Sequence, residues 1–242
     1  MRRILLPLLL VLLGACASTA PTPEAVTTAA AAPAAAASAT ESATDSSRWE
    51  LDIQAFERED AVVRRRAGSV VFVGSSSIRY WQSLDTDFPG VASINRGFGG
   101  SRVYDSLYYA DRIVAPYQPR AVVFYAGDND LSEGRTPLQV RDDFAAFVER
   151  VRAAAPQARI GFISIKPSPS RAALLPQVRE ANALVRAYAQ QAKGVDYLDV
   201  YTPMLQASGA PRPELFLDDA LHMNRSGYEI WTDVVGAWLG RL

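Results

Sequence analysis

A serine-rich turn stands directly after a short apolar run. Val70-Val71-Phe72-Val73 is followed by Gly74 and then by Ser75, Ser76 and Ser77. The run is β-branched and aromatic and ends at a glycine, which predicts a buried strand. A serine just past such a strand lies where open α/β sheets bind ligands, and a positioned base would make its hydroxyl a nucleophile for acyl transfer. The alternative, to which this turn alone gives equal weight, is that the serines only cap a short helix.

A base for that chemistry is present once in the chain. His222 is the only histidine, so it is the only side chain of its kind that titrates near neutral pH. Asp219 stands three residues earlier and can reach back to the imidazole to fix its tautomer. A histidine just before a helix also fits a capping or surface role, and that role stays open at this point.

Two other loops offer hydrogen-bond donors for a developing negative charge. Asn95-Arg96-Gly97-Phe98-Gly99-Gly100 follows one predicted strand, and Asp128-Asn129-Asp130 follows another. The N–H of Gly100, the side-chain amide of Asn129 and the N–H of the nucleophile itself would make an oxyanion hole. Read singly, Gly100 could only begin a helix and Asn129 could only form a turn.

The elements that must position these residues alternate along the chain. Apolar runs predict strands at 70–73, 91–94, 121–125, 159–165 and 195–200. Helices are predicted at 50–66, around Trp81 and Leu84, at 101–112, from Pro137 behind a Thr136–Gln139 capping box, at 176–192, and from Asn224 onward. Five strand–helix alternations predict one parallel sheet with helices on both faces, an α/β fold of three layers, α/β/α. Its functional loops should lie at the carboxyl ends of the strands.

Two of these helices are expected to turn particular apolar side chains to the core. They are Leu51, Ile53, Phe56, Val62 and Val63 in the helix at 50–66, and Tyr104, Leu107 and Tyr108 in the helix at 101–112.

The first 47 residues are not expected to belong to this domain. Met1-Arg2-Arg3, an apolar core at 4–13 and Gly14-Ala15 before Cys16 predict a secretory signal peptide over 1–15. The segment resembles a bacterial lipobox, which implies cleavage before Cys16 and lipid on that residue; the alternative is an ordinary signal peptide. Residues 16–47, rich in Ala, Thr, Pro and Ser, predict a disordered tether, so the domain is expected at 48–242. Ala17 after the cysteine suggests the periplasmic face of the outer membrane.

Composition excludes several functions. The chain has no basic run and a formal net charge of −1, which argues against nucleic-acid binding. One cysteine cannot form an intrachain disulfide, and one histidine with one lipidated cysteine cannot build a zinc site, so no metal and no cofactor are expected. The oligomeric state is not predicted.

From Val70 to Leu239 the sequence resembles the GDSL esterases, also called SGNH hydrolases. Val73-Gly74-Ser75-Ser76-Ser77-Ile78 is similar to the first family block, which implies Ser76 as the nucleophile. The glycine-rich block ending at Gly100 is similar to the second, whose last glycine donates to the oxyanion. Ser75 replaces the family's aspartate, which leaves Ser75 and Ser77 as alternatives.

Two later blocks complete the resemblance. Gly127-Asp128-Asn129-Asp130 is similar to the family's Gly-x-Asn-Asp block and implies Asn129 as an oxyanion donor. Asp219-Ala220-Leu221-His222 is similar to the Asp-x-x-His block. The resemblance implies a flavodoxin-like sandwich, a Ser-His-Asp triad of Ser76, His222 and Asp219, and an acyl-enzyme intermediate. The chain has no Gly-x-Ser-x-Gly elbow, which argues against the α/β-hydrolase fold.

The substrate implied is a small ester, with short acyl or O-acetyl groups favoured over long chains. Carbohydrate O-acetyl groups, short-chain esters, lysophospholipids and acetyl esters like platelet-activating factor stay open. Arg102, Tyr104 and the loop 166–171 are expected to border the pocket, with Tyr104 equally suited to the core. Two other hypotheses remain, a module that holds an anion in the Gly/Ser turn and an inactive relative that binds acylated glycans. No Walker-type lysine follows Gly74, which disfavours the first.

Overall fold

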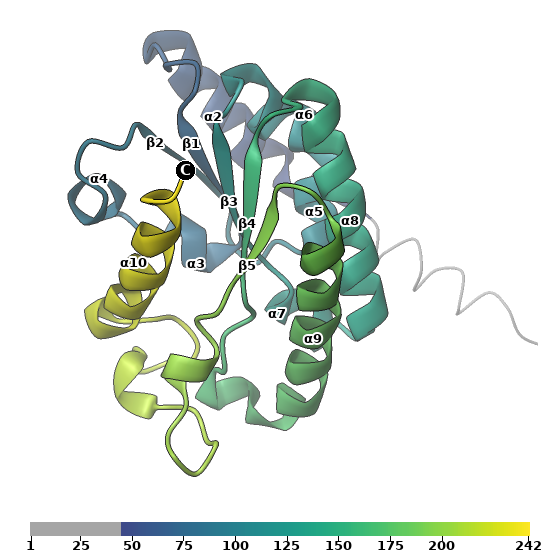
Figure 1. Ribbon diagram of the computed structural model, residues 1–242, viewed down its shortest axis with the longest axis vertical. Helices are drawn as coiled ribbons and strands as arrows, with labels where there is room; N and C mark the ends of the chain where they lie inside the picture. The colour runs from purple at the N-terminus through teal and green to yellow at the C-terminus, as the bar shows by residue number, and fades with distance from the viewer. Residues whose placement is uncertain (1–44) are drawn as a thin grey trace, which may run out of the picture.

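A sheet of five parallel strands forms the centre of the computed structural model, which describes residues 45–242 (Figure 1). The strands stand in the order β2-β1-β3-β4-β5. Their bounds are β1 Val70–Gly74, β2 Ser93–Gly97, β3 Ala121–Tyr125, β4 Arg159–Ile163 and β5 Val195–Leu198. Each strand pairs in parallel with its neighbours, as the strand–helix alternation predicted.

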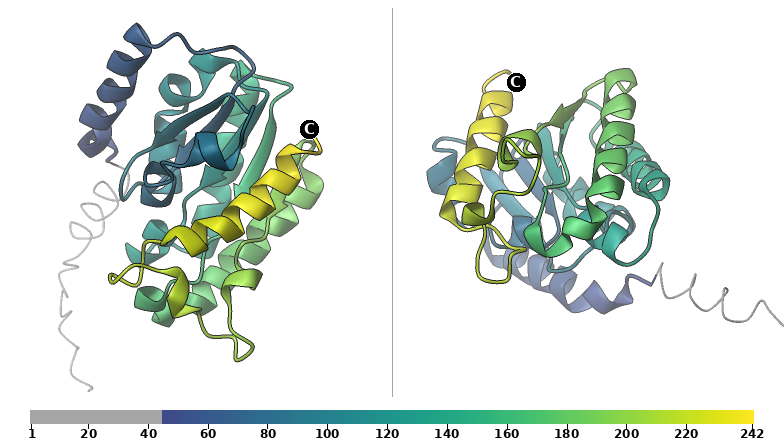
Figure 2. Two further views of the ribbon diagram at one scale, coloured as in Figure 1. Left: turned by 90° about the vertical axis from the view of Figure 1, so that its left-hand side faces the viewer. Right: turned by 90° about the horizontal axis from the view of Figure 1, so that it is seen from below.

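Helices cover both faces of the sheet, so the predicted three-layer α/β/α fold is confirmed. One face packs against α2 Glu50–Val62, α5 Val103–Tyr108, α6 Ala110–Ile113, α8 Pro137–Ala154 and α9 Leu175–Gln191. The other face packs against α3 Ser76–Arg79, α4 Leu84–Asp87 and α10 Arg225–Leu239. Figure 2 shows α10 on one side of the sheet and α8 and α9 on the other. The remaining elements are α7 Asp128–Ser132, which follows β3, and the 3-10 turns η1 Ser47–Trp49, η2 Ala115–Tyr117, η3 Pro169–Leu174, η4 Thr202–Met204 and η5 Pro213–Leu215.

The N-terminal predictions lie mostly outside the described residues. The signal peptide, Cys16 and the tether up to residue 44 are among them. Ser46 and Ser47, which the sequence analysis assigned to the tether, belong to the described part. Ser46 is buried, and its Oγ donates to Asp105 at 2.6 Å. Within residues 45–242, no helix is both long and apolar enough to cross a membrane.

The second strand begins later than predicted. The interpretation placed it at 91–94, whereas β2 runs from Ser93 to Gly97, with Ser93 paired to Val70 and Gly97 to Gly74. The sequence pattern did not place Arg96 in a strand, because a charged side chain is unusual in a buried strand. Arg96 is buried and forms ion pairs with Glu59 and Asp60 of α2, which compensate its burial.

The predicted apolar face of the first helix is correct at Ile53 and Phe56, which pack against the core. It is wrong at Leu51, Val62 and Val63, which are exposed. Within α2 only Ile53 is fully buried, while Leu51 and Val62 are 74% and 83% exposed. Ion pairs bind much of this helix to the domain, with Glu50 and Glu57 both contacting Arg112. Because ion pairs produce no apolar periodicity in the sequence, the face that α2 turns to the domain could be predicted only in part from that pattern.

The next predicted helix, 101–112, is interrupted. α5 ends at Tyr108 and α6 starts at Ala110, so Tyr109 lies between them. Tyr109 is buried and Tyr108 is 60% exposed, the reverse of the prediction for Tyr108. Leu107 packs against the core as predicted, and the break after Tyr108 turns Tyr109 inward in place of Tyr108.

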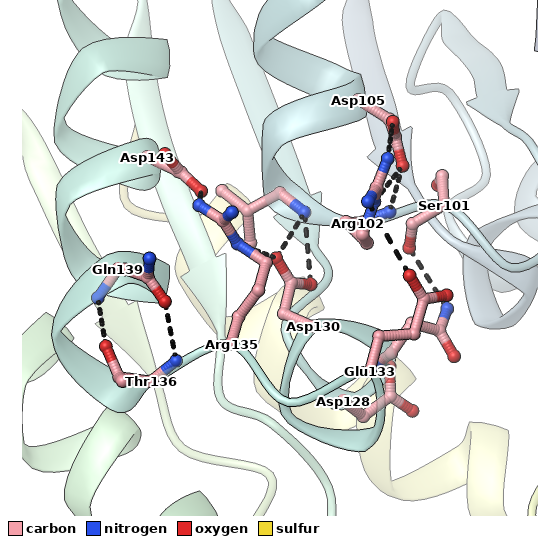
Figure 3. Close-up of polar contacts among 12 residues, drawn as sticks. Ser101, Arg102, Asp105, Asp128, Asp130, Glu133, Arg135, Thr136, Gln139 and Asp143 are labelled. Carbon is pink, nitrogen blue, oxygen red and sulfur yellow. Dashed lines mark hydrogen bonds and ion pairs between the residues drawn. The ribbon is translucent and has the colours of Figure 1, made fainter. Parts of the chain in front are cut away.

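The helix α8 begins as predicted. Thr136 is its N-cap, and its hydroxyl accepts a bond from the N–H of Gln139 at 3.2 Å. The side chain of Gln139 accepts from the N–H of Thr136 at 2.9 Å (Figure 3). This reciprocal pair is a capping box.

Candidate active site

The serine turn takes its shape from Gly74. This residue has φ +140°, and a Cβ there would lie 1.7 Å from the carbonyl oxygen of Tyr125. Only glycine therefore lets β1 end this close to β3. The N–H of Ser75 donates to the same carbonyl at 3.0 Å, and α3 starts at the next residue, Ser76.

Of the three serines, only Ser76 contacts the histidine. Ser75 and Ser77 are buried, and their hydroxyls have no hydrogen-bond partner within residues 45–242. Ser76 is half-buried, and its Oγ lies 2.9 Å from Nε2 of His222, across 146 positions of sequence. The geometry therefore favours Ser76 among the three candidates.

Asp219 holds the other side of the imidazole. Its Oδ2 lies 2.5 Å from Nδ1 of His222, and its Oδ1 accepts from the N–H groups of Leu221 and His222 at 2.9 Å each. Burial opposes ionisation, but the bonds from His222 and Leu221 outweigh it and lower the pKa of Asp219 to about 2. A carboxylate at this position fixes a proton on Nδ1 and leaves Nε2 free to accept one from Ser76.

Residues 217–222, which contain Asp219 and His222, form the acid–base loop. The backbone of this loop folds back on itself. The N–H of Leu217 donates to the carbonyl of His222 at 2.8 Å, and a β-bridge joins Phe216 to Met223. Ala220, inside the loop, has φ +53°, a left-handed conformation that costs an L-residue free energy. The ring of Tyr80 meets the imidazole edge-on, with centroids 5.0 Å apart. Such contacts restrict the orientation of His222.

The three residues expected to form the oxyanion hole each have an N–H hydrogen available for a new hydrogen bond. The N–H groups of Ser76 and Gly100 donate to no acceptor in the described part of the chain. Gly100 has φ +75°, which favours glycine at this turn. The amide nitrogen of Asn129 donates once, to the carbonyl of Ser101 at 3.0 Å, so one of its two hydrogens is available. These are the donors that the sequence suggested for an oxyanion hole.

A buried charge cluster next to Asn129 is not indicated by any local sequence pattern. Nζ of Lys166 donates to Oδ2 of Asp128 at 2.8 Å and to the hydroxyl of Tyr125 at 3.0 Å. Nη1 of Arg171 lies 3.3 Å from the same Asp128 oxygen. Burial raises the pKa of Asp128, but the charges of Lys166 and Arg171 outweigh it and keep the pKa below its ordinary value. Burial also lowers the pKa of Lys166, against the pull of Asp128.

The expected pocket border is partly wrong. Lys166 is 2% exposed and Arg102 is 1% exposed, so both lie in the interior. Arg102 forms an ion pair with Asp105 at 2.9 Å, as Figure 3 shows. Tyr104 is half-buried, and its ring contacts the guanidinium of Arg135. Each buried cation has an acidic partner, which is why burial is tolerated.

Asp130 connects the start of α7 to the start of α5. Its side chain is fully buried and accepts from the N–H of Val103, the first residue of α5, at 3.1 Å. Burial is the main cause that raises the pKa of Asp130 to about 7, against the effect of the bond from Val103 and the charge of Arg135. Figure 3 shows this carboxylate beside Arg135, which pairs in turn with Asp143.

No group of three or more His, Cys, Asp and Glu side chains within residues 45–242 is arranged to hold a metal ion.

Comparison with known proteins assigns the chain to a family. Residues 67–230 match the model of the GDSL-like lipase/acylhydrolase family. The chain belongs to the GDSL-like lipase/acylhydrolase family. The matched region contains Ser76, Gly100, Asn129, Asp219 and His222. Membership makes the chain a hydrolase of carboxylic esters, as the resemblance implied.

The chain is similar, for example, to one curated protein and two solved structures. Platelet-activating factor acetylhydrolase IB subunit alpha1 of Homo sapiens is 27% identical over 168 residues, which are 66% of this chain and 70% of the relative. A GDSL-like lipase of Bacteroides thetaiotaomicron has a similar structure, with TM-score 0.68, 22% identity, and coverage of 82% of this chain and 98% of the other. A carbohydrate esterase family 3 protein of Talaromyces cellulolyticus gives TM-score 0.56, 18% identity, and coverage of 72% and 96%. The two structural likenesses support the fold.

Proposed function

We propose that this protein is a serine esterase that cleaves short acyl or O-acetyl groups from small substrates through a Ser76-His222-Asp219 triad. The observation that carries the proposal is the continuous line of contacts from Oγ of Ser76 to Nε2 of His222 and from Nδ1 to Asp219, at 2.9 and 2.5 Å. These two contacts in series, the first spanning 146 positions and the second three, match the requirement of a nucleophile, its base and the group that orients the base.

The reaction proceeds in two halves. His222 takes the proton of Ser76 as Oγ attacks the ester carbonyl, and the tetrahedral oxyanion accepts bonds from the N–H groups of Ser76 and Gly100 and from the amide of Asn129. His222 then gives the proton to the leaving alcohol, and an acyl-enzyme remains on Ser76. Water, deprotonated by His222, attacks this ester, the acid leaves, and the proton returns to the serine.

The size of the acyl group is the finer part of the proposal. The matched human relative is named an acetylhydrolase, and a similar structure is named a carbohydrate esterase. The first name specifies an acetyl group and the second an ester of a carbohydrate, and for this chain we propose removal of a small acyl group from a larger alcohol. A series of p-nitrophenyl esters from acetate to palmitate, with acetylated glycans alongside, tests it. Activity limited to acetate and butyrate supports short acyl groups, and a preference for palmitate contradicts the proposal.

The decisive experiment compares the three neighbouring serines. Ser76→Ala and His222→Ala should each lower kcat for p-nitrophenyl acetate about 10⁴-fold or more, because each removes a group of the triad. Ser75→Ala and Ser77→Ala serve as matched controls and should keep most of the activity. A fluorophosphonate probe should label the wild-type protein and not Ser76→Ala, because only an activated serine reacts. Full hydrolysis by Ser76→Ala would overturn the triad, and absence of labelling in the wild type would favour a binding module.

We also propose that the mature protein is a lipoprotein of the cell envelope, anchored through Cys16 at the periplasmic face of the outer membrane. The support is the order of a positive segment, an apolar segment and Gly14-Ala15 before the only cysteine. Cys16→Ala should abolish incorporation of labelled palmitate and release the protein from the membrane fraction. A Cys16→Ala protein that stays in the membrane fraction would contradict the anchor.

A further inference from the structure

The segment after β4 connects the two sides of the site, although it contains none of the proposed catalytic residues. Its Ser170 donates to the carbonyl oxygen of Ala220 twice, from N–H at 3.0 Å and from Oγ at 2.9 Å. Ala220 lies between Asp219 and His222 in the acid–base loop. The next residue, Arg171, points the other way, and its Nη2 donates to Oδ1 of Asn129 at 2.8 Å. One dipeptide thus contacts both the acid–base loop and the proposed oxyanion donor.

The contact with Arg171 decides which way the amide of Asn129 faces. A guanidinium only donates, so the atom of Asn129 that meets it must be the oxygen Oδ1 and not the NH₂ group. The NH₂ group then faces the carbonyl of Ser101, which only accepts. Rotation of the amide by 180° would set donor against donor and acceptor against acceptor. With the amide in this orientation, one hydrogen goes to Ser101 and the second stays available for an oxyanion.

Arg171 is itself held by buried acidic charge. Its Nη1 lies 3.3 Å from Oδ2 of Asp128, and the Arg171 side chain is 19% exposed against 7% for Asp128. Nζ of the buried Lys166 donates to the same oxygen at 2.8 Å. The other oxygen of Asp128 accepts from the N–H of Asn129 at 3.1 Å. Asp128 therefore fixes the backbone of Asn129 while Arg171 fixes its side chain.

We propose that Arg171 is a positioning residue of the esterase, which orients the Asn129 amide as an oxyanion donor before substrate arrives. This inference rests on the proposed function. A donor that is already aimed costs no reorganisation as charge develops, so it acts mainly on the transition state. Loss of Arg171 should therefore lower kcat and leave KM nearly unchanged.

A double-mutant cycle between Arg171 and Asn129 tests the inference on p-nitrophenyl acetate. Asn129→Ala removes a donor and should cost about 10²–10³-fold in kcat. Arg171→Met leaves the donor but frees its rotation, so we expect a loss of about 10- to 100-fold with KM within about threefold. In the Asn129→Ala background, Arg171→Met should cost no more than about threefold, because the residue it orients is gone. Arg179→Met, at an exposed arginine of α9, is the matched control and should keep wild-type kcat.

Arg171→Lys guards against a folding defect. It keeps a positive charge beside Asp128 but lacks the fork that reaches Asp128 and Asn129 together. It should therefore unfold at the wild-type temperature, yet lower kcat several-fold with Asn129 present and not in Asn129→Ala. Wild-type kcat in both Arg171 variants, or losses that multiply with that of Asn129→Ala, would overturn the inference.

Ser76→Ala, measured alongside, separates the two proposals. If Ser76→Ala stays active, the triad itself is wrong; if it is inactive while the cycle is additive, only the role of Arg171 is wrong.

Discussion

The Asp219–His222 loop and the first turn of α7, Asp128–Asp130, form two sides of the site. They are held by different kinds of contact. In the loop, Asp219 bonds to residues two and three positions away, and its side chain is 47% exposed. In the turn, Asp128 is 7% exposed and Asp130 fully buried, and the partner of Asp128, Lys166, lies 38 positions away. One side depends on short-range bonds near solvent, and the other on paired charges in the interior.

This difference separates activity from stability. Exposed ion pairs contribute little to the free energy of unfolding. Removal of the Asp219 charge should therefore lower kcat far more than it lowers stability. A buried charge that loses its partner destabilises the whole domain. We therefore expect substitutions on the loop side to act on kcat and substitutions beneath the turn to act on unfolding.

The largest effect is expected from Asp219→Asn. An amide at this position no longer favours a proton on Nδ1 of His222, so Nε2 is no longer held ready to accept a proton from Ser76. We expect kcat for p-nitrophenyl acetate to fall by about 10⁴-fold while the melting temperature stays nearly unchanged. Asp218→Asn, at the exposed neighbouring aspartate, is the control and should retain wild-type activity. A large fall in melting temperature would show that the loop contributes to stability after all.

Beneath the turn, Lys166→Met should act the other way round. It leaves Asp128 buried with only Arg171 as a cationic partner, and breaking a buried pair costs about 3–5 kcal/mol. Urea denaturation of the full chain measures this loss. Lys193→Met is a matched control, because the chain has one other lysine and it is exposed. Equal unfolding free energies for the two variants would break the proposed contrast.

The loop side was also the easier one to predict from the sequence. His222 is the only histidine, Asp219 stands three residues away, and β1, which leads to Ser76, is an uninterrupted apolar run. Each of these features is visible within a short window, so residue type and spacing were enough to assign the triad candidates. The fold followed from the alternation of strands and helices for the same reason.

The buried turn could not be predicted in this way. Lys166 and Arg171 carry no local signal, and their contacts with Asp128 and Asn129 span 38 and 42 positions. Arg96 and Arg102 were hidden likewise, because a buried arginine is compatible with a strand or helix only when an acidic partner arrives from elsewhere. Leu51 of α2 is the reverse case, because it is apolar and yet exposed. Its neighbour Glu50 forms an ion pair with Arg112 that holds this part of the helix against the domain.

Asp130 gives the contrast a pH dependence. Its pKa of about 7 in the folded protein exceeds its ordinary value of 3.8, so between about pH 4 and 7 the folded state binds a proton that the unfolded state lacks. Stability therefore falls as pH rises through this window and levels off above it. Asp130→Asn mimics the protonated side chain and keeps an acceptor for Val103. The variant should gain about 1–3 kcal/mol over the wild type at pH 8 relative to pH 5, measured by urea denaturation.

Asp111→Asn provides the comparison for that pH series. Asp111 pairs with Arg150 at the surface, where both side chains are 55% exposed, so its substitution should leave the pH dependence unchanged. If Asp130→Asn retains the wild-type decline between pH 5 and 8, the buried carboxyl is not its source.

The smallest effect is expected from Ala220→Gly, back in the acid–base loop. Ala220 has φ +53°, where an L-residue pays about 1–2 kcal/mol that glycine does not, against about 0.5–1 kcal/mol of extra chain entropy for glycine. The net gain should be about 0.5 kcal/mol. The carbonyl that accepts from Ser170 is unchanged, so kcat should stay within about twofold. Ala183→Gly, at an exposed site within α9, should instead lose about 1 kcal/mol. Thermal unfolding should thus give opposite signs for two chemically identical substitutions; a loss in both would mean that the left-handed residue beside Asp219 carries no strain.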